Sequence, residues 1–209
     1  NEMAIMCRKL GINVWEVIDA AATKPFGFMP FYPGPGVGGH CIPIDPFYLT
    51  YKARSVDYHT RLIELAGEIN NYMPEYVTAR LQDLLNDQEK PLKKSKILLL
   101  GIAYKGDVDD VRESPALKVW DQLEAKGADV IYHDPYCKSA KRKDRIFRSH
   151  ALDEELLKNV DAVVVTTAHT RGVDYRMVVE AAPLVLDTKN IVTKATGINP
   201  ASYPGLHIL

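Results

Sequence analysis

Short apolar runs that alternate with helical patterns determine what the second half of this chain can fold into. In sequence order, the runs are KILLLGI at 96–102, DVIY at 129–132, DAVVVT at 161–166 and LVLD at 184–187. Between several of them the spacing of apolar residues predicts helices, at 114–126, 153–158 and 175–182. Apolar strands that alternate with helices are typical of a parallel sheet covered on both faces. We therefore predict an α/β fold, with a doubly wound, Rossmann-like domain over residues 94–209.

Residues 1–93 have a different pattern, which predicts an all-helical domain. Apolar residues recur at helical spacing over 3–10 and 14–21, and 47–54 predicts a further helix. The same spacing continues over 62–85, interrupted by Pro74, which should kink the helix or mark a break. A helix of about 40 Å is longer than one small domain can cover, so its apolar stripe should meet a partner.

The stretch GPGVGGHCIPIDP, residues 34–46, is the strongest indication of chemistry. Its glycines lack a Cβ and let a substrate, a cofactor or another backbone approach Cys41 closely. Pro46 suits the first turn of a helix and Asp45 its N-cap, which places Cys41 just before a helix N-terminus. That N-terminus and the adjacent His40 favour a thiolate, so Cys41 is a candidate nucleophile. The alternatives are a small buried cysteine in a tight turn and a histidine that only shapes this turn.

Three glycines of this stretch, at 34, 36 and 39, also match the dinucleotide fingerprint G-x-G-x-x-G. That fingerprint needs a hydrophobic strand before it and a helix that opens directly from it. Prolines at 30 and 33 precede it here, and more prolines follow. We reject the match, and no other segment supplies the fingerprint.

The loop after the first predicted strand, residues 103–113, is expected at the carboxyl end of the sheet, where ligands bind in such folds. Lys105 can offset phosphate charge, and Arg112 can bind phosphate or carboxylate oxygens with two N–H groups. The same charges could instead pair with the aspartates at 107, 109 and 110 in a surface loop. The residues alone leave both interpretations open.

Composition excludes several classes of function. The chain has 209 residues, of which 46% are apolar and 25% charged, as in ordinary globular proteins. A net charge of -1 gives no general electrostatic reason to bind nucleic acid or an anionic membrane. The basic run at 138–145 is interpreted as a solvated loop. Three cysteines form no disulfide framework, no metal ligand is predicted, and no signal peptide or long apolar span is found, so we expect a cytoplasmic protein.

Three motifs, in order and in register, resemble the UDP-glucose/GDP-mannose dehydrogenase family of nucleotide-sugar 6-dehydrogenases. They are GPGVGGHCIPIDPFYL at 34–49, GIAYKGDVDDVRESPA at 101–116 and LVLDTKNI at 184–191. The GHC and IDP forms, with TKPFGFMPFYPGPG before them, are most similar to the branch that oxidises UDP-N-acetylhexosamines, particularly UDP-N-acetylglucosamine. UDP-glucose, UDP-N-acetylmannosamine and GDP-mannose are the alternatives, with Ile44 against UDP-glucose. Since family members begin with an NAD-binding domain, the resemblance implies a fragment without that domain, inactive by itself.

The resemblance also implies a reaction, which supplies precursors for polysaccharide synthesis. The C6 alcohol of the sugar is oxidised in two steps to a carboxylate, and two NAD are reduced. Cys41 would trap the intermediate aldehyde as a thiohemiacetal that becomes a thioester. Asp45 would orient or deprotonate the water that releases the acid.

Further site residues follow from the family's motifs. Tyr104 and Lys105 would hold the nucleotide-sugar, Arg112 would reach NAD, and Lys189 stands where many members have an arginine. The substrate would be wrapped by backbone of residues 32–38, with Tyr32, Gly34, Gly36 and Gly38 as its contacts. Lys24 lies near the position of an arginine that members contribute from the neighbouring subunit.

Family members pair through their central helical region, so residues 1–93 are predicted to form a homodimer and residues 94–209 to bind UDP. We expect Leu81 and Leu84, within the long helix, at the subunit interface. Two other classes remain open. A cysteine hydrolase or acyltransferase would also use Cys41, and a non-catalytic nucleotide-sugar-binding dimerisation module would share both domains without the chemistry.

Overall fold

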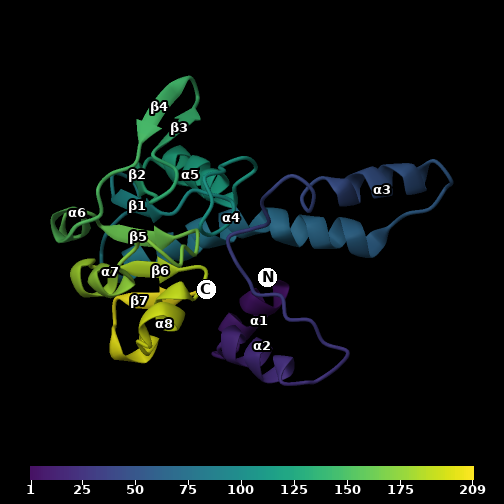
Figure 1. Ribbon diagram of the computed structural model, residues 1–209, viewed down its shortest axis with the longest axis horizontal. Coiled ribbons are helices and arrows are strands. Elements are labelled where there is room, and N and C mark those ends of the chain that lie inside the picture. Colours follow the sequence, from purple (N-terminus) through teal and green to yellow (C-terminus); the bar gives the residue numbers. More distant parts are fainter.

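A helical region precedes the sheet domain in the computed structural model, which describes residues 1–209 (Figure 1). The helices of this region are α1 (Glu2–Lys9), α2 (Val14–Ala22), α3 (Asp45–Arg54) and α4 (Arg61–Asp87). The sheet domain follows as β1 (Lys96–Leu100), α5 (Pro115–Ala125), β2 (Asp129–His133), β3 (Ser139–Arg142), β4 (Arg145–Arg148), α6 (Glu154–Lys158), β5 (Ala162–Val165), α7 (Tyr175–Ala181), β6 (Val185–Asp187), α8 (Ile191–Thr196) and β7 (Leu206–Ile208). The predicted fold class is confirmed.

Five parallel strands form the sheet, in the order β2-β1-β5-β6-β7. The chain proceeds from β1 to β2 on one side and continues from β5 on the other. The strand order therefore reverses between β1 and β5, which are hydrogen-bonded neighbours. In doubly wound sheets ligands bind outside the carboxyl ends of the strands at such a switch point.

Alternate residues of each strand pack into cores on opposite faces of the sheet. Ile97 and Leu99 join the side chains of α4 and α5 in one core. Leu98 and Leu100 join those of α6, α7 and α8 in the other. Both faces are covered, which explains why these strands are continuous apolar runs instead of alternating apolar and polar residues.

Helix α4 belongs partly to the sheet domain, which corrects one prediction. Leu81 and Leu84, expected at a subunit interface, are 0% and 3% exposed in the core between α4, α5 and the sheet. Helical spacing shows that a stripe is covered but not by what. The first half of α4 projects away from the sheet with α3 beside it (Figure 1), and Leu62 there is 82% exposed. Helix α4 lies within residues 1–93, but its second half packs in the core of the second predicted domain. The division of the chain into domains 1–93 and 94–209 therefore stays a prediction.

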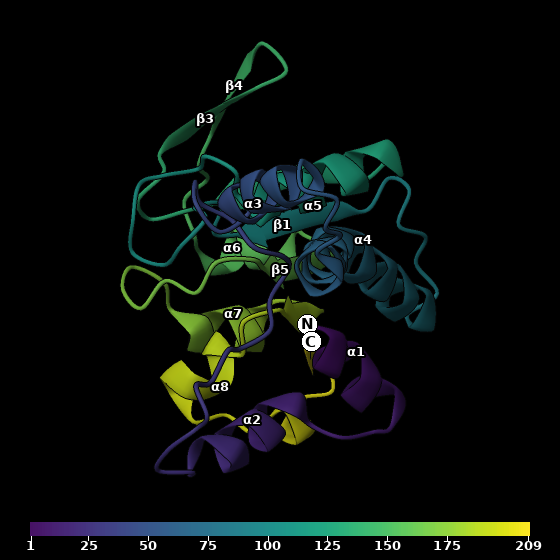
Figure 2. The same cartoon turned by 90° about the vertical axis from the view of Figure 1, so that its right-hand side faces the viewer.

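Helices α1 and α2 form a small cluster of their own. Ala4, Cys7, Val14 and Trp15 are buried together, with Ile208 of β7 against them. Asn13 caps α2 by accepting the Trp15 backbone N–H at 3.0 Å. Figure 2 shows both helices below the sheet, with α8 nearby.

Of two local predictions, one is narrowed to one of its alternatives and the other was wrong. Pro74 does not break α4, which continues to Asp87. The basic run at 138–145, expected as a solvated loop, forms most of the β3–β4 hairpin that projects from the sheet (Figures 1 and 2). Its Arg142 is 7% exposed, because its guanidinium lies 4.4 Å from the Trp120 ring centroid and pairs with Glu124.

Candidate active site

The glycine segment, residues 34–39, passes directly against the sheet domain. A Cβ on Gly38 would lie 2.7 Å from Pro115 Cδ and 2.8 Å from the carbonyl oxygen of Glu113. A Cβ on Gly39 would lie 3.1 Å from the Tyr104 ring, and Gly39 has φ +91°. These glycines are therefore required by close approach, and they bring the segment before Cys41 onto the loop after β1.

The other end of the segment reaches the loop after β6. A Cβ on Gly34 would lie 2.7 Å from Lys189 Nζ. The Gly34 N–H donates to Asn1 Oδ1 at 2.9 Å, and Asn1 Nδ2 donates to Asn70 Oδ1 at 2.6 Å. Gly36, with φ +133°, lies close to the Asn70 carbonyl of α4. The segment thus connects α1, α4 and the carboxyl end of β6.

Cys41 is exposed, unlike the two other cysteines of the chain. Its carbonyl accepts the Ile44 N–H at 3.0 Å and the Asp45 N–H at 2.8 Å, which forms the turn that leads into α3. The helix begins at Asp45 with Pro46 in its first turn, and Ile44 occupies the cap position that we had assigned to Asp45. No side chain caps this helix end, and Asp45, four residues after Cys41, is exposed.

Cys7 and Cys137 are buried. Burial and the negative charge of Asp134 raise the pKa of the Cys137 thiol well above its usual range. Cys7 packs among the apolar side chains of α1 and α2. Of the three thiols, only that of Cys41 is accessible to a substrate.

Lys189 stands at the carboxyl end of β6, and Asp187 forms the turn that presents it. Asp187 is 0% exposed and accepts the Lys189 N–H at 2.9 Å and the Val192 N–H at 2.8 Å. Burial raises the pKa of Asp187 to about 6. Burial also lowers the pKa of Lys189, while Asp187 opposes that shift. A second anion beside Lys189 would favour its charged form.

The loop after β1 carries the remaining charged candidates at the surface. Arg112 pairs with Asp110 through two N–H groups, Nε to Oδ1 at 3.0 Å and Nη2 to Oδ2 at 2.7 Å. The hydrogen bonds from Arg112 lower the pKa of Asp110 to about 2, and the charge of His40 adds to this effect. Lys105 is exposed, and Tyr104 donates its backbone N–H to the Asp110 carbonyl at 2.9 Å.

Tyr32 and Lys24 lie apart from this group. Tyr32 stacks on Trp15 with ring centroids 5.5 Å apart, and its hydroxyl donates to Asp19 at 2.6 Å. Lys194 Nζ lies 4.1 Å from the Tyr32 ring centroid. Lys24 is exposed, with its ammonium 6.0 Å from the Phe26 ring centroid. The structure brings neither side chain to Cys41, and their roles in binding substrate stay predictions.

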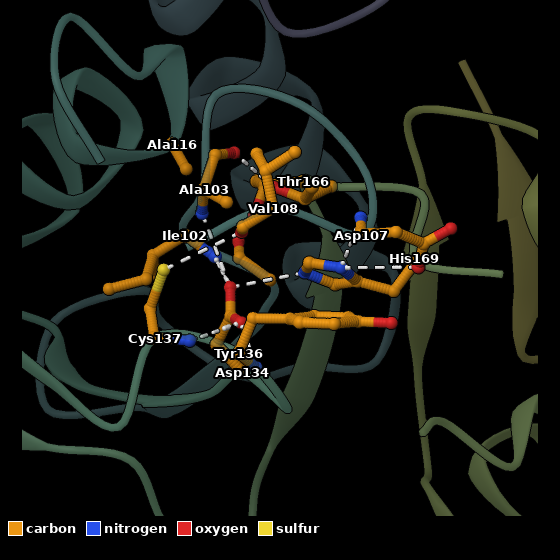
Figure 3. A network of polar contacts seen from close by, with 12 residues as sticks. Ile102, Ala103, Asp107, Val108, Ala116, Asp134, Tyr136, Cys137, Thr166 and His169 are labelled. Atoms are coloured by element: carbon orange, nitrogen blue, oxygen red, sulfur yellow. Dashed lines mark hydrogen bonds and ion pairs between the residues drawn. The ribbon is translucent and has the colours of Figure 1, made fainter. Parts of the chain in front are cut away.

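A buried polar network beneath the loop after β1 was missed in the sequence (Figure 3). Asp134, after β2, and His169, after β5, are both 0% exposed and lie 3.1 Å apart, Oδ2 to Nε2. His169 Nδ1 also accepts the Asp107 N–H at 3.0 Å. The available signal was a polar residue soon after each apolar run, at the strand ends where ligand sites form.

Comparison with known proteins identifies the family. Residues 1–72 match the UDP-glucose/GDP-mannose dehydrogenase family, central domain, and residues 98–194 match its UDP binding domain. The chain belongs to this family. A UDP-N-acetyl-D-mannosamine dehydrogenase from Methanocaldococcus jannaschii is 36% identical over 203 residues, 93% of this chain and 43% of that protein. The chain thus spans less than half the length of this relative.

Solved structures of dehydrogenases of this kind have the same fold. A UDP-D-ManNAc dehydrogenase from Pyrococcus horikoshii gives a TM-score of 0.81 at 30% identity, over 99% of this chain and 46% of that one. An NDP-N-acetyl-D-galactosaminuronic acid dehydrogenase from Methanosarcina mazei gives 0.80 at 26% identity, over 100% and 46%. The UDP-glucose/GDP-mannose dehydrogenase family is NAD-dependent.

The loop at the carboxyl end of β1 does not have the form of a dinucleotide-binding turn. A Rossmann site needs a tight glycine turn from which a helix opens, but residues 101–114 form a long loop before α5 begins at Pro115. Arg112 is the one residue predicted to contact NAD, and this contact stays a prediction. No helix of the chain is both long and apolar enough to cross a membrane, and no group of three or more His, Cys, Asp or Glu side chains is arranged to hold a metal ion.

Proposed function

We propose that this chain binds a UDP-N-acetylhexosamine and carries the cysteine that forms the covalent intermediate in its oxidation to the uronic acid. The observation that carries the proposal is the glycine segment, which joins the exposed Cys41 to Tyr104 at one end and to Lys189 at the other. Several relatives, including those from Methanocaldococcus jannaschii and Campylobacter jejuni, are UDP-N-acetyl-D-mannosamine dehydrogenases. We therefore propose UDP-N-acetylmannosamine as substrate in place of UDP-N-acetylglucosamine.

Cys41 acts on the aldehyde that the first oxidation produces. Its thiolate attacks the C6 carbonyl carbon to give a thiohemiacetal, whose oxygen takes up a proton. NAD, which Arg112 would contact, would supply the hydride acceptor for both oxidations, and Cys41 would then hold the oxidised sugar as a thioester. The exposed Asp45 carboxylate, one helical turn from Cys41, positions and deprotonates the water that releases the acid.

The other residues hold the nucleotide end of the substrate. Lys189 and Lys105 supply positive charge for the diphosphate, and the ring of Tyr104 lies against Gly39. Burial of Lys189 strengthens its attraction for phosphate, because an ion pair gains more where water is excluded. Removal of the Lys105 charge, as in Lys105→Ala, should weaken UDP binding measured by calorimetry.

Covalent trapping tests the role of Cys41 without any oxidant. The C6 aldehyde of the UDP-sugar, labelled with carbon-13 at C6, should give a thiohemiacetal resonance with the chain and none with Cys41→Ala. Cys7→Ala is the matched control, because Cys7 is a buried thiol that should affect stability alone. A thiohemiacetal on the Cys41→Ala variant would refute the assignment of the nucleophile.

The same experiment distinguishes the sugars. The aldehyde derived from UDP-N-acetylmannosamine should saturate Cys41 at a lower concentration than those from UDP-N-acetylglucosamine and UDP-glucose. Equal saturation by all three would contradict the proposed substrate but not the covalent step. A cysteine hydrolase would instead form a thioester from an activated acyl donor, and a non-catalytic module would bind UDP-sugars without any adduct.

We also propose a homodimer, formed through the exposed apolar face of α3 and the first half of α4. Leu49, Tyr51, Leu62 and Leu65 on this face are between 49% and 82% exposed. A groove of 480 Å³ opens between the two helices and is lined by residues that include Phe47 and Ala66. Exposed apolar side chains that gather on one face are typical of a protein–protein interface.

A further inference from the structure

Asp134 joins three loops at the switch point of the sheet. Its Oδ2 accepts the N–H groups of Ile102 at 2.8 Å and Ala103 at 3.2 Å, from the loop after β1, and His169 Nε2 at 3.1 Å, from the loop after β5. Its Oδ1 accepts the N–H groups of Tyr136 and Cys137, each at 2.9 Å, from its own loop. Both oxygens face donors only, so only an ionised carboxylate satisfies this site.

The charge state of Asp134 agrees with this geometry. Burial alone would raise its pKa, but hydrogen bonds from His169, Cys137 and Ile102 lower the pKa to about 2. Asp134 is 0% exposed, so no solvent or substrate contacts it in this structure. It can therefore act on a ligand only through the loops that it holds.

His169 extends this hold to the middle of the loop after β1. A backbone N–H only donates, so Nδ1 of His169 is the acceptor for Asp107, and Nε2 carries the proton donated to Asp134. The Asp107 carboxylate accepts the Thr170 N–H at 2.9 Å and its hydroxyl at 2.5 Å. A Cβ on Gly106 would lie 2.1 Å from the Ala168 carbonyl oxygen, so the two loops also touch directly.

Tyr104 and Lys105 lie between these two anchors. Ala103 before them is bound to Asp134, and Asp107 after them is bound to His169 and Thr170. We infer that Asp134 and His169 are positioning residues, which hold residues 103–107 in the conformation that receives the nucleotide of the UDP-sugar. The inference rests on the proposed function, since it assigns a task to side chains placed at the UDP site.

Calorimetry of UDP binding to the 209-residue chain tests the inference. His169→Ala removes both hydrogen bonds and should raise the dissociation constant of UDP by about tenfold, which corresponds to about 1.4 kcal/mol. His169→Asn keeps an acceptor at the place of Nδ1, and should stay within about threefold of the wild type. This rescue separates positioning of the loop from simple filling of the core.

The matched control is His133→Ala. His133 is 8% exposed, directly precedes Asp134, and bonds through Nδ1 to the His150 carbonyl at 2.7 Å, away from the loop after β1. This variant should lose stability without loss of UDP affinity. Amide hydrogen exchange should increase at residues 103–107 in His169→Ala, and should remain at the wild-type level there in His133→Ala.

Thr170→Val provides a test that does not depend on folding of a core variant, because Thr170 is exposed. It removes only the hydroxyl bond to Asp107 and should weaken UDP binding by about threefold to fivefold. Unchanged UDP affinity in both His169→Ala and Thr170→Val would overturn the positioning role. If instead the wild-type chain failed to bind UDP, the proposed function itself would be wrong.

Discussion

Asp187 should give the chain a pH-dependent stability of unusual sign for a carboxylate. Its pKa is raised by burial from 3.8 to about 6. The folded state therefore binds a proton more readily than the unfolded state between these values. Stability from this group is fully present below about pH 4 and is lost as the pH rises to about 6, by roughly 3 kcal/mol at most.

Urea unfolding of the wild type and Asp187→Asn between pH 4 and 7 measures this effect. The difference between the two free energies of unfolding should change across this window, because asparagine does not titrate. His133 and His207, whose pKa values are lowered by burial, also titrate nearby, but they contribute equally to both proteins. A difference that is constant with pH would show that the pKa of Asp187 is not raised in the folded state.

At the level of residues, the sequence predicted groups that act at the surface and missed those that act from within. Cys41 was predicted as the nucleophile because a dense cluster of glycines indicates a close approach, and such a cluster is visible in a linear sequence. Asp134 and His169 are separated by 35 residues, and only the fold brings them within 3.1 Å. Their hydrogen bonds go largely to backbone N–H groups, which no residue type reveals.

The glycine segment is the element on which the site depends, and Gly38→Ala tests it. The added Cβ would meet Pro115, the Glu113 backbone and Tyr104 within 3.0 Å, all of them parts that cannot rotate away. The segment should move off the loop after β1 at a cost of about 1–3 kcal/mol. Calorimetry should show UDP-sugar affinity lowered by at least about tenfold, because this movement would change the position of Cys41 relative to Tyr104.

Gly27→Ala is the control for that substitution. Gly27 has φ +73° and nothing within 4 Å of a Cβ, so alanine adds about 1 kcal/mol of backbone strain without a collision. It should lower the melting temperature and leave UDP-sugar affinity unchanged. Equal loss of affinity in both variants would mean that general destabilisation, and not the close approach of Gly38, weakens binding.

Elements with a clear apolar pattern were predicted within a few residues, including the short helices α6 and α7, whereas β3, β4, α8 and β7 were not predicted. The four apolar runs became β1, β2, β5 and β6, and the long helical pattern became α4. The strand β7 spans only Leu206–Ile208 and contains His207, so it lacks a continuous apolar run. The β3–β4 hairpin was hidden because its charges are satisfied in part by Asp121 and Glu124 of α5.

In the whole molecule, α4 serves both regions, since its second half completes the core of the sheet domain and its first half carries an exposed apolar face. The two halves should respond differently to the same substitution. Leu81→Asp would bury a charge without a partner at a site that is 0% exposed, and should unfold the chain. Leu65 is 49% exposed, so Leu65→Asp should leave the far-ultraviolet circular dichroism unchanged.

Sedimentation at micromolar concentration should then show a dimer for the wild type and a folded monomer for Leu65→Asp. A two-fold axis would place this face against its copy, so each substitution enters the interface twice. Ile146→Asp is the matched control, because Ile146 is 71% exposed on the β3–β4 hairpin, away from α3 and α4. It should remain dimeric. A monomeric wild type would refute the dimer, and a dimer that persists in Leu65→Asp would place the interface on another surface.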